Sequence, residues 1–169
     1  DVEKVPSHGG SIRVYVTKKI SKKVTKKDNI NKFIQKEADY KLKNIQTYIR
    51  FHSELINQKL RLKKFFSKLE NEVVYGYGAP AKAVTLINFF ELNSSNINLI
   101  VDDSKLKQKK YIPGTKIKIY NSNILNKKPP KFIVILAWNL YQDILIKLKK
   151  YNKIQYAIIP LPKFKIVKL

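Results

Sequence analysis

A glycine turn between a strand and a helix constrains the fold of this chain more than any other feature. Residues 73–77 are mostly β-branched or aromatic, as in a buried strand, and Gly76 and Gly78 mark its end. Pro80 follows where a helix would begin, because its φ is already helical and it has no amide hydrogen to lose. The order strand, glycine turn, helix start is typical of an α/β unit that binds the phosphate of a nucleotide.

The turn predicts an anion site built mainly from backbone amides between Gly78 and Ala81. Glycines allow a close approach of the backbone to a phosphate, and Lys82 would add its charge in the first turn of the helix. The spacing Gly76-x-Gly78-x-x-Ala81 also fits the dinucleotide-binding pattern, and Asp102 follows at about the distance of a residue that contacts a ribose hydroxyl. Alternatively, the glycines serve only the turn and helix packing, and Asp102 caps a turn.

From residue 72 onward the chain alternates strands with helices. Near-continuous apolar runs predict buried parallel strands at 73–77, 97–101, 117–120, 132–137 and 156–160. We therefore predict an α/β fold with a Rossmann-like parallel sheet of about five strands and helices on both faces, preceded by a β-hairpin and a long helix. Ligands of such sheets bind beyond the carboxyl ends of the strands, so we expect Asp102, Thr115, Trp138 and Asn139 to converge there. Asn139 could instead cap the helix that follows it.

The N-terminal part has a different pattern. Ile12, Val14 and Val16 alternate with polar or aromatic residues, which predicts strands in residues 1–19, and His8 lies in a turn from which it could project into a cleft. Helical spacing of apolar residues follows in a linker and long helix at 20–71. A lone hairpin is marginally stable in water, so these strands favour a fragment of a longer protein over a complete one. Residues 72–169 form the predicted Rossmann-like domain.

The amino-acid composition limits the kinds of site and of partner that the chain can have. The 169 residues include no cysteine and two histidines, so we expect no disulfide and no metal site. No apolar run is long enough to span a membrane, and we expect a cytoplasmic protein. The net charge of +23 would attract nucleic acid, but the excess is lysine, with only three arginines, which favours solvated faces and nonspecific attraction.

Several motifs, in order along nearly the whole chain, resemble the C-terminal part of sugar-nucleotide C-methyltransferases. The matching segments are at residues 6–16, 77–83, 86–88, 101–103, 107–115, 136–140 and 160–162. Members of this family consist of an N-terminal zinc-binding segment, a central domain that binds S-adenosylmethionine, and a C-terminal Rossmann-like domain that helps to hold the sugar nucleotide. The resemblance implies that residues 1–19 are the last two strands of the methyltransferase sheet.

The 169 residues lack the cysteines, the glycine-rich S-adenosylmethionine loop and the Tyr-x-Glu-His motif of that family. We therefore predict the sugar-nucleotide-binding part of such an enzyme, inactive by itself, with no cofactor of its own and with the methyltransferase domain as partner in cis or in trans. We expect no catalytic residue here. The predicted substrate-binding residues are His8, Gly76, Gly78, Ala79, Pro80, Ala81, Lys82, Asp102, Thr115 and Asn139. The alternatives are a lysine-rich nucleic-acid-binding module and a free-standing Rossmann domain that binds an NAD-type cofactor.

Overall fold

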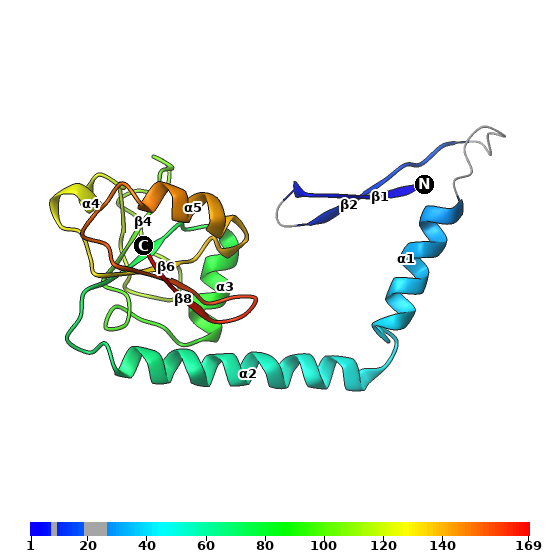
Figure 1. Cartoon of the computed structure of the whole chain (residues 1–169), viewed down its shortest axis with the longest axis horizontal. Coiled ribbons are helices and arrows are strands. Elements are labelled where there is room, and N and C mark those ends of the chain that lie inside the picture. Colours follow the sequence, from blue (N-terminus) through cyan, green and yellow to red (C-terminus); the bar gives the residue numbers. More distant parts are fainter. Residues whose placement is uncertain (8–9, 19–26) are drawn as a thin grey trace. The chain divides into compact units, whose positions relative to one another are not determined.

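The computed structural model describes residues 1–7, 10–18 and 27–169. The chain divides into two compact units, Asp1–Ile56 and Asn57–Leu169, here called the N-terminal and the C-terminal unit. The N-terminal unit contains the strands β1 (Val2–Val5) and β2 (Ser11–Val14), the helix α1 (Lys27–Asp39) and the first half of α2 (Ile45–Ser67) (Figure 1). The second half of α2 belongs to the C-terminal unit.

The N-terminal unit has little core of its own. β1 and β2 pair antiparallel, with Val2 opposite Val14, and Arg13 and Tyr15 both bind the Glu3 carboxylate on the surface of the hairpin. Within the described part of this unit, Val2 is the only buried side chain. The hairpin and the helices therefore hold their shape by local hydrogen bonds more than by burial of apolar surface.

A six-stranded sheet forms the centre of the C-terminal unit. Its elements are β3 (Val74–Tyr77), α3 (Ala81–Phe89), β4 (Leu99–Val101), β5 (Ile119–Tyr120), α4 (Ile124–Lys127), β6 (Phe132–Ile135), η2 (Trp138–Leu140), α5 (Tyr141–Leu148), β7 (Tyr156–Ile159) and β8 (Lys165–Lys168). The strand order is β5-β4-β3-β6-β7-β8, and only β8 runs antiparallel to its neighbour. This order turns back at β3, because the chain moves outward through β4 and β5 before it returns to β6.

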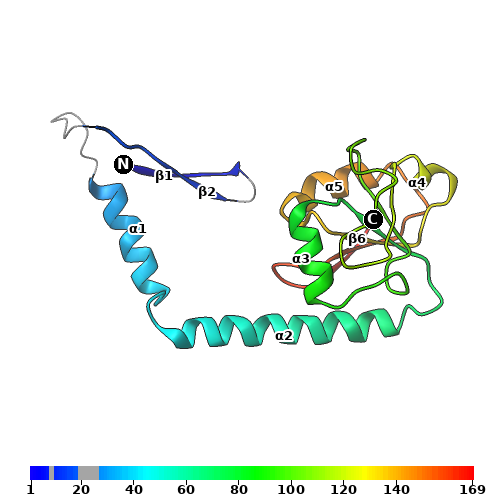
Figure 2. The same ribbon diagram turned by 180° about the vertical axis from the view of Figure 1, so that it is seen from behind.

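Helices pack on both faces of the sheet, as the alternation of strands and helices predicts. On one face, Leu62 and Phe66 of α2 and Ile87 of α3 share a core with alternate strand residues; Figure 2 shows α3 in front of the strands. On the other face, Ile144 and Leu148 of α5 form a second core. Each large apolar side chain buried in these cores contributes about 1.5–3 kcal/mol.

Ion pairs and aromatic contacts attach α2 to the rest of the C-terminal unit. Lys59 Nζ lies 2.5 Å from Glu91 Oε1, and Lys63 pairs with the other oxygen of the same carboxylate. Hydrogen bonds from these two ammonium groups lower the pKa of Glu91 to about 2. The Phe65 ring contacts the rings of Phe132 and Phe164. The second half of α2 is thus part of this unit's core, although the sequence pattern assigned all of it to a linker and long helix.

The predicted fold class is confirmed, with one addition. The sheet is mostly parallel and follows a hairpin and a long helix, but it has a sixth strand, β8, that the sequence analysis did not predict. β8 consists of Ile166 and Val167 between two lysines, and it forms by pairing antiparallel with β7. A four-residue edge strand of this composition has too weak a pattern to be separated from a polar tail.

Gly76 is required for packing inside β3. Strand alternation turns this position toward the α3 face, where an added Cβ would lie 2.6 Å from Ile100 Cγ1 and 2.8 Å from Leu136 Cδ1. Contacts this short force the neighbouring side chains to move. The glycine is therefore explained by the close packing of three adjacent strands.

We predict that Gly76→Ala destabilises the protein by about 1–3 kcal/mol, the usual cost of overpacking a core. Urea denaturation followed by circular dichroism measures the change. A Gly76→Ala variant as stable as the parent would show that the three strands leave more room than their geometry indicates.

We also predict that limited proteolysis with trypsin removes the N-terminal unit before the C-terminal unit is cut. Both units are rich in lysine, but only the C-terminal unit has an extensive core in the described residues. Mass spectrometry should find a resistant fragment that begins within or near α2 and extends to the C-terminal strands. Equal persistence of fragments from residues 1–56 would contradict this expectation.

Candidate functional site

The candidate site lies where two neighbouring strands lead to opposite faces of the sheet. β3 and β6 are parallel neighbours, and Tyr77 pairs with Ile135 near their carboxyl ends. β3 leads into α3 on one face, whereas β6 leads through η2 into α5 on the other. The two loops approach closely, because a Cβ added to Gly78 would lie 3.0 Å from the Cβ of Ala137. Ligands of α/β sheets bind at such switch points.

Two of the turn's amides are already used by the protein. Gly78 N–H donates to the Val101 carbonyl at 2.8 Å, and Ala79 N–H donates to Asp102 Oδ2 at 2.6 Å. Pro80 has no amide hydrogen. The prediction that the amides from Gly78 to Ala81 together hold an anion therefore needs correction, because β4 and its following loop occupy the first two donors.

The donors that remain are at the start of α3. Pro80 stands at the N-cap and provides no side-chain cap, and Ala81 and Lys82 are the first helical residues. Amides at these positions have no partner within a helix. Ala81 is exposed and Lys82 is half-buried, so solvent reaches both residues. The positive φ of Gly78, 85°, gives the chain the bend that leads into this helix start.

Lys82 is held at the same place by two residues of η2. Its Nζ lies 2.5 Å from Asn139 Oδ1 and 5.3 Å from the centre of the Trp138 ring. Both partners are uncharged, so they orient the ammonium without neutralising it. Asn139 does not cap the following helix; the N-cap of α5 is Leu140. The structure thus brings Lys82 and Asn139, two of the predicted site residues, into direct contact.

Asp102 is tied to the chain's own donors. Its side chain is buried and accepts hydrogen bonds from the amides of Ala79 at 2.6 Å and Ser104 at 2.9 Å, and from Lys107 Nζ at 3.3 Å. A carboxylate offers about four acceptor positions, and three are filled here. This geometry favours a role in shaping the loop over the predicted contact with a ribose hydroxyl.

Two predicted residues, Gly76 and Thr115, do not join this cluster. Gly76 lies inside β3 and is explained by packing. Thr115 precedes β5, so it lies at the amino edge of the sheet, where its hydroxyl donates to the Ile112 carbonyl at 3.0 Å. The expectation that Thr115 converges with the other loops is corrected by this position, because residues before a parallel strand and residues after one lie at opposite edges. His8 lies outside the described residues.

Sequence reasoning missed a second polar group beside the turn. The Tyr77 hydroxyl donates to Asp103 Oδ2 at 3.3 Å, and Lys147 Nζ of α5 lies 3.8 Å from the same oxygen. Burial raises the pKa of the Tyr77 phenol well above its ordinary value, and the negative charge of Asp103 adds to this rise. Strand alternation in 74–77 could have placed Tyr77 on the α5 face, but no sequence signal linked it to Lys147.

The part of the chain that the structure describes contains neither a metal centre nor a membrane-spanning helix. Among its residues, no three His, Cys, Asp or Glu side chains gather closely enough to hold a metal ion. In the same part of the chain, no helix is both long enough and apolar enough to cross a membrane. The expected lack of a metal site and the expected cytoplasmic location stay predictions.

Comparison with known proteins agrees with the motifs and the fold. The family model described as C-methyltransferase C-terminal domain matches residues 6–162. The chain is also 25% identical over 171 aligned residues to the C-methyltransferase NovU of Streptomyces niveus; the match covers 99% of this chain and 40% of that protein. The chain therefore spans less than half the length of this relative. Because the family model covers almost all of the chain, the protein belongs to the family of C-methyltransferase C-terminal domains.

Proposed function

We propose that the C-terminal unit binds the diphosphate of a sugar nucleotide as the substrate-holding part of a sugar C-methyltransferase. The observation that carries this proposal is the uncapped start of α3 beside the Lys82 ammonium, at the switch point between β3 and β6. A helix start carries roughly half a positive charge, and free amides there suit an anion. Family membership and the resemblance to sugar-nucleotide enzymes supply the class of substrate.

The charge of Lys82 is held in place at the switch point by uncharged partners, so it stays available to a ligand. Lys59, Lys107 and Lys131 are paired with carboxylates, whereas the contacts of Lys82 are to an amide oxygen and an aromatic ring. An incoming phosphate therefore gains a full charge-assisted hydrogen bond, which is worth about 1.5–3 kcal/mol. Asn139 then has its amide free to donate to a second phosphate oxygen.

The alternatives have less support. The dinucleotide pattern places the ribose contact of an NAD-type cofactor at Asp102, which is buried with three donors around it. A nucleic-acid module would owe its binding to a general lysine field, which requires no particular residue at the switch point. Neither alternative is favoured by the family match.

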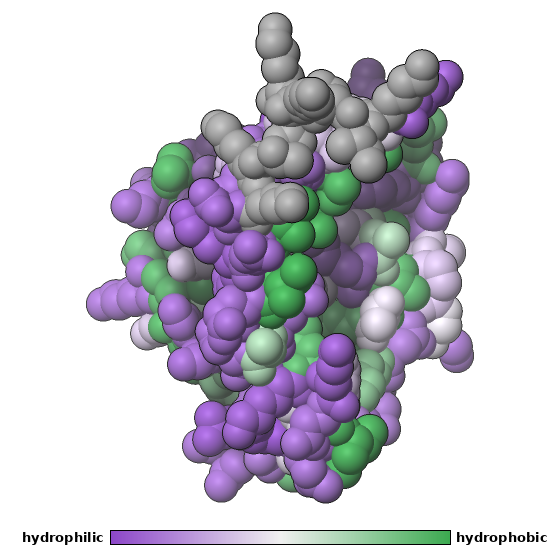
Figure 3. Space-filling view, turned by 90° about the vertical axis from the view of Figure 1, so that its right-hand side faces the viewer, coloured by the Kyte–Doolittle hydropathy of each residue, from purple (hydrophilic) through white to green (hydrophobic). Residues whose placement is uncertain are grey.

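We further propose that the N-terminal unit packs against the rest of a longer methyltransferase, in cis or in trans. Its described side chains leave an unusual amount of apolar surface open, with Val16 86% and Ile45 66% exposed. Figure 3 shows apolar side chains among hydrophilic ones at the surface. Exposed apolar residues in such number are typical of an interaction site.

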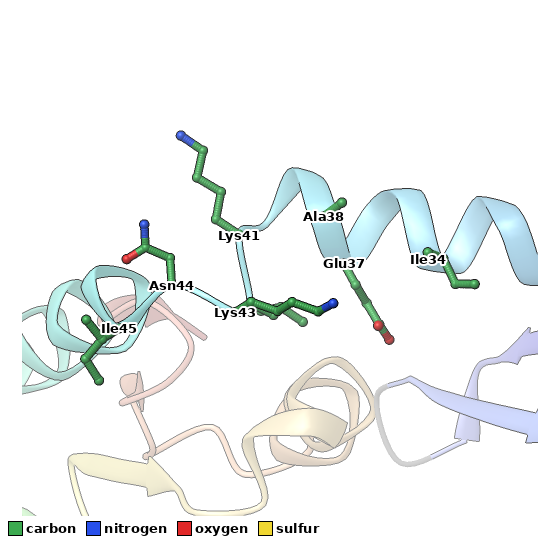
Figure 4. A pocket seen from close by; sticks show the side chains of 8 residues that line it. Ile34, Glu37, Ala38, Lys41, Lys43, Asn44 and Ile45 are labelled. Carbon is green, nitrogen blue, oxygen red and sulfur yellow. The ribbon is translucent and has the colours of Figure 1, made fainter.

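The corner between α1 and α2 is part of this surface. A hollow of about 860 Å³ there is lined by apolar residues, among them Ile34, Leu42 and Ile45, with charged residues around them. In Figure 4, Lys41 points away from the side toward which Ile34 and Glu37 project.

S-adenosylmethionine and the catalytic base belong, in this proposal, to the packing partner. That domain would deprotonate the carbon beside the sugar ketone, and the resulting carbanion would take the sulfonium methyl group.

We predict that Lys82→Ala weakens the binding of thymidine diphosphate roughly 10- to 150-fold, since a charge-assisted hydrogen bond is lost. Isothermal titration calorimetry at fixed salt measures it. Lys116→Ala, which removes the same charge beside Thr115 at the opposite edge of the sheet, is the matched control and should leave the affinity nearly unchanged. Equal losses in both variants would mean that only the general lysine field attracts the nucleotide.

The proposal about the N-terminal unit predicts what the DNA upstream of the codon for Asp1 encodes. An open reading frame that continues into a glycine-rich S-adenosylmethionine loop, or an adjacent gene for such a domain, is the expected result. Sequencing this region of the genome is sufficient. A region with neither would leave the apolar surface of this unit without the partner proposed for it.

A further inference from the structure

Resting on the proposed function, we propose that Asp103 recognises a sugar hydroxyl of the bound nucleotide, in place of its neighbour Asp102. Both residues follow β4, where sugar hydroxyls bind in nucleotide-binding sheets of this type. Asp102 is buried and accepts from two backbone amides and a lysine. It therefore has almost no capacity left for a ligand.

Asp103 has that capacity. Its side chain is 57% exposed. Its two contacts, to the Tyr77 hydroxyl at 3.3 Å and to Lys147 Nζ at 3.8 Å, both use Oδ2. Within the described part of the chain, Oδ1 has no partner. A carboxylate oxygen of this kind readily accepts a hydrogen bond from a hydroxyl group, and it repels a phosphate. Its chemistry therefore selects the sugar end of a nucleotide over the diphosphate.

The surroundings of Asp103 orient it beside the proposed diphosphate site. Tyr77, whose hydroxyl donates to it, is joined directly to Gly78 at the start of the turn. The phenol is buried and its pKa is raised, so it stays protonated and remains a donor. Lys147 offsets part of the negative charge, which would otherwise disfavour a diphosphate nearby. Two residues from β3 and α5 thus fix a free carboxylate oxygen at the carboxyl edge of β4.

The test compares ligands with and without sugars in the Asp103→Asn chain. Calorimetric affinities are measured for inorganic pyrophosphate, thymidine diphosphate and thymidine diphosphate glucose in the wild-type and variant chains. We expect the preference for a sugar-bearing ligand over pyrophosphate to fall roughly 10-fold in the variant, because a hydrogen bond to a charged acceptor is lost. Pyrophosphate as the reference offsets only part of the general effect of removing one negative charge, so the measurements are repeated at high salt, which screens that effect and leaves the contribution of the hydrogen bond.

The two sugar-bearing ligands distinguish the source of the hydroxyl. A fall for both ligands identifies the pentose of the nucleoside, and a fall only for the glucose derivative identifies the hexose; either result supports the proposal. Tyr77→Phe, which keeps the ring but removes the donor, should reduce the same preference to a smaller extent. Circular dichroism of each variant shows that the fold is retained.

An unchanged preference in a folded Asp103→Asn chain would overturn this inference alone, provided that Lys82→Ala still weakens binding. Failure of the proposed function gives a different result, in which the wild-type chain binds none of the three ligands, or Lys82→Ala and Lys116→Ala weaken them equally. That outcome overturns both proposals.

Discussion

The hydrogen bond from Ala79 N–H to the buried Asp102 carboxylate sets the geometry of the carboxyl edge. Together with the bond from Gly78 N–H to Val101, it fastens the turn after β3 to the end of β4. A buried carboxylate without donors is costly, so Asp102 and the turn require each other. The position of Pro80, the start of α3 and the place of Lys82 all follow from this attachment. The acidic residue that looks like a ligand contact in the sequence acts here as part of the framework.

This attachment decides which backbone amides and which side chains are available to a ligand at the site. In a fully open glycine loop, several consecutive amides would face the ligand. Here the first two face inward, and the positive charge available at the switch point is concentrated in the helix start and Lys82. Trp138 and Asn139 approach from the neighbouring strand and hold the ammonium without cancelling it. The other lysines also contribute to the net charge of +23.

The two units differ in how they bury apolar side chains. The C-terminal unit places them in two cores, one on each face of its sheet. The N-terminal unit, in its described residues, buries Val2 alone and exposes isoleucines, valines and tyrosines along its strands and helices. The chain therefore contains one unit with two extensive cores and one unit whose described apolar residues are mostly exposed. We propose that other parts of a longer enzyme cover this exposed surface, and the chain matches 40% of the length of its relative.

The sequence by itself determined the fold class and the order strand, turn, helix, because β-branched runs, glycines and helix-start prolines act through local backbone energetics. It also identified Lys82 and Asn139 as candidate site residues, because each follows a predicted strand. Only the tertiary structure decided which candidates meet: Thr115 lies at the other edge, Gly76 serves packing, and Asp102 binds an amide of the turn. Hydrogen-bond partners and the edge strand β8 depend on segments distant in the chain, and a local pattern has no information about which donor will reach which acceptor.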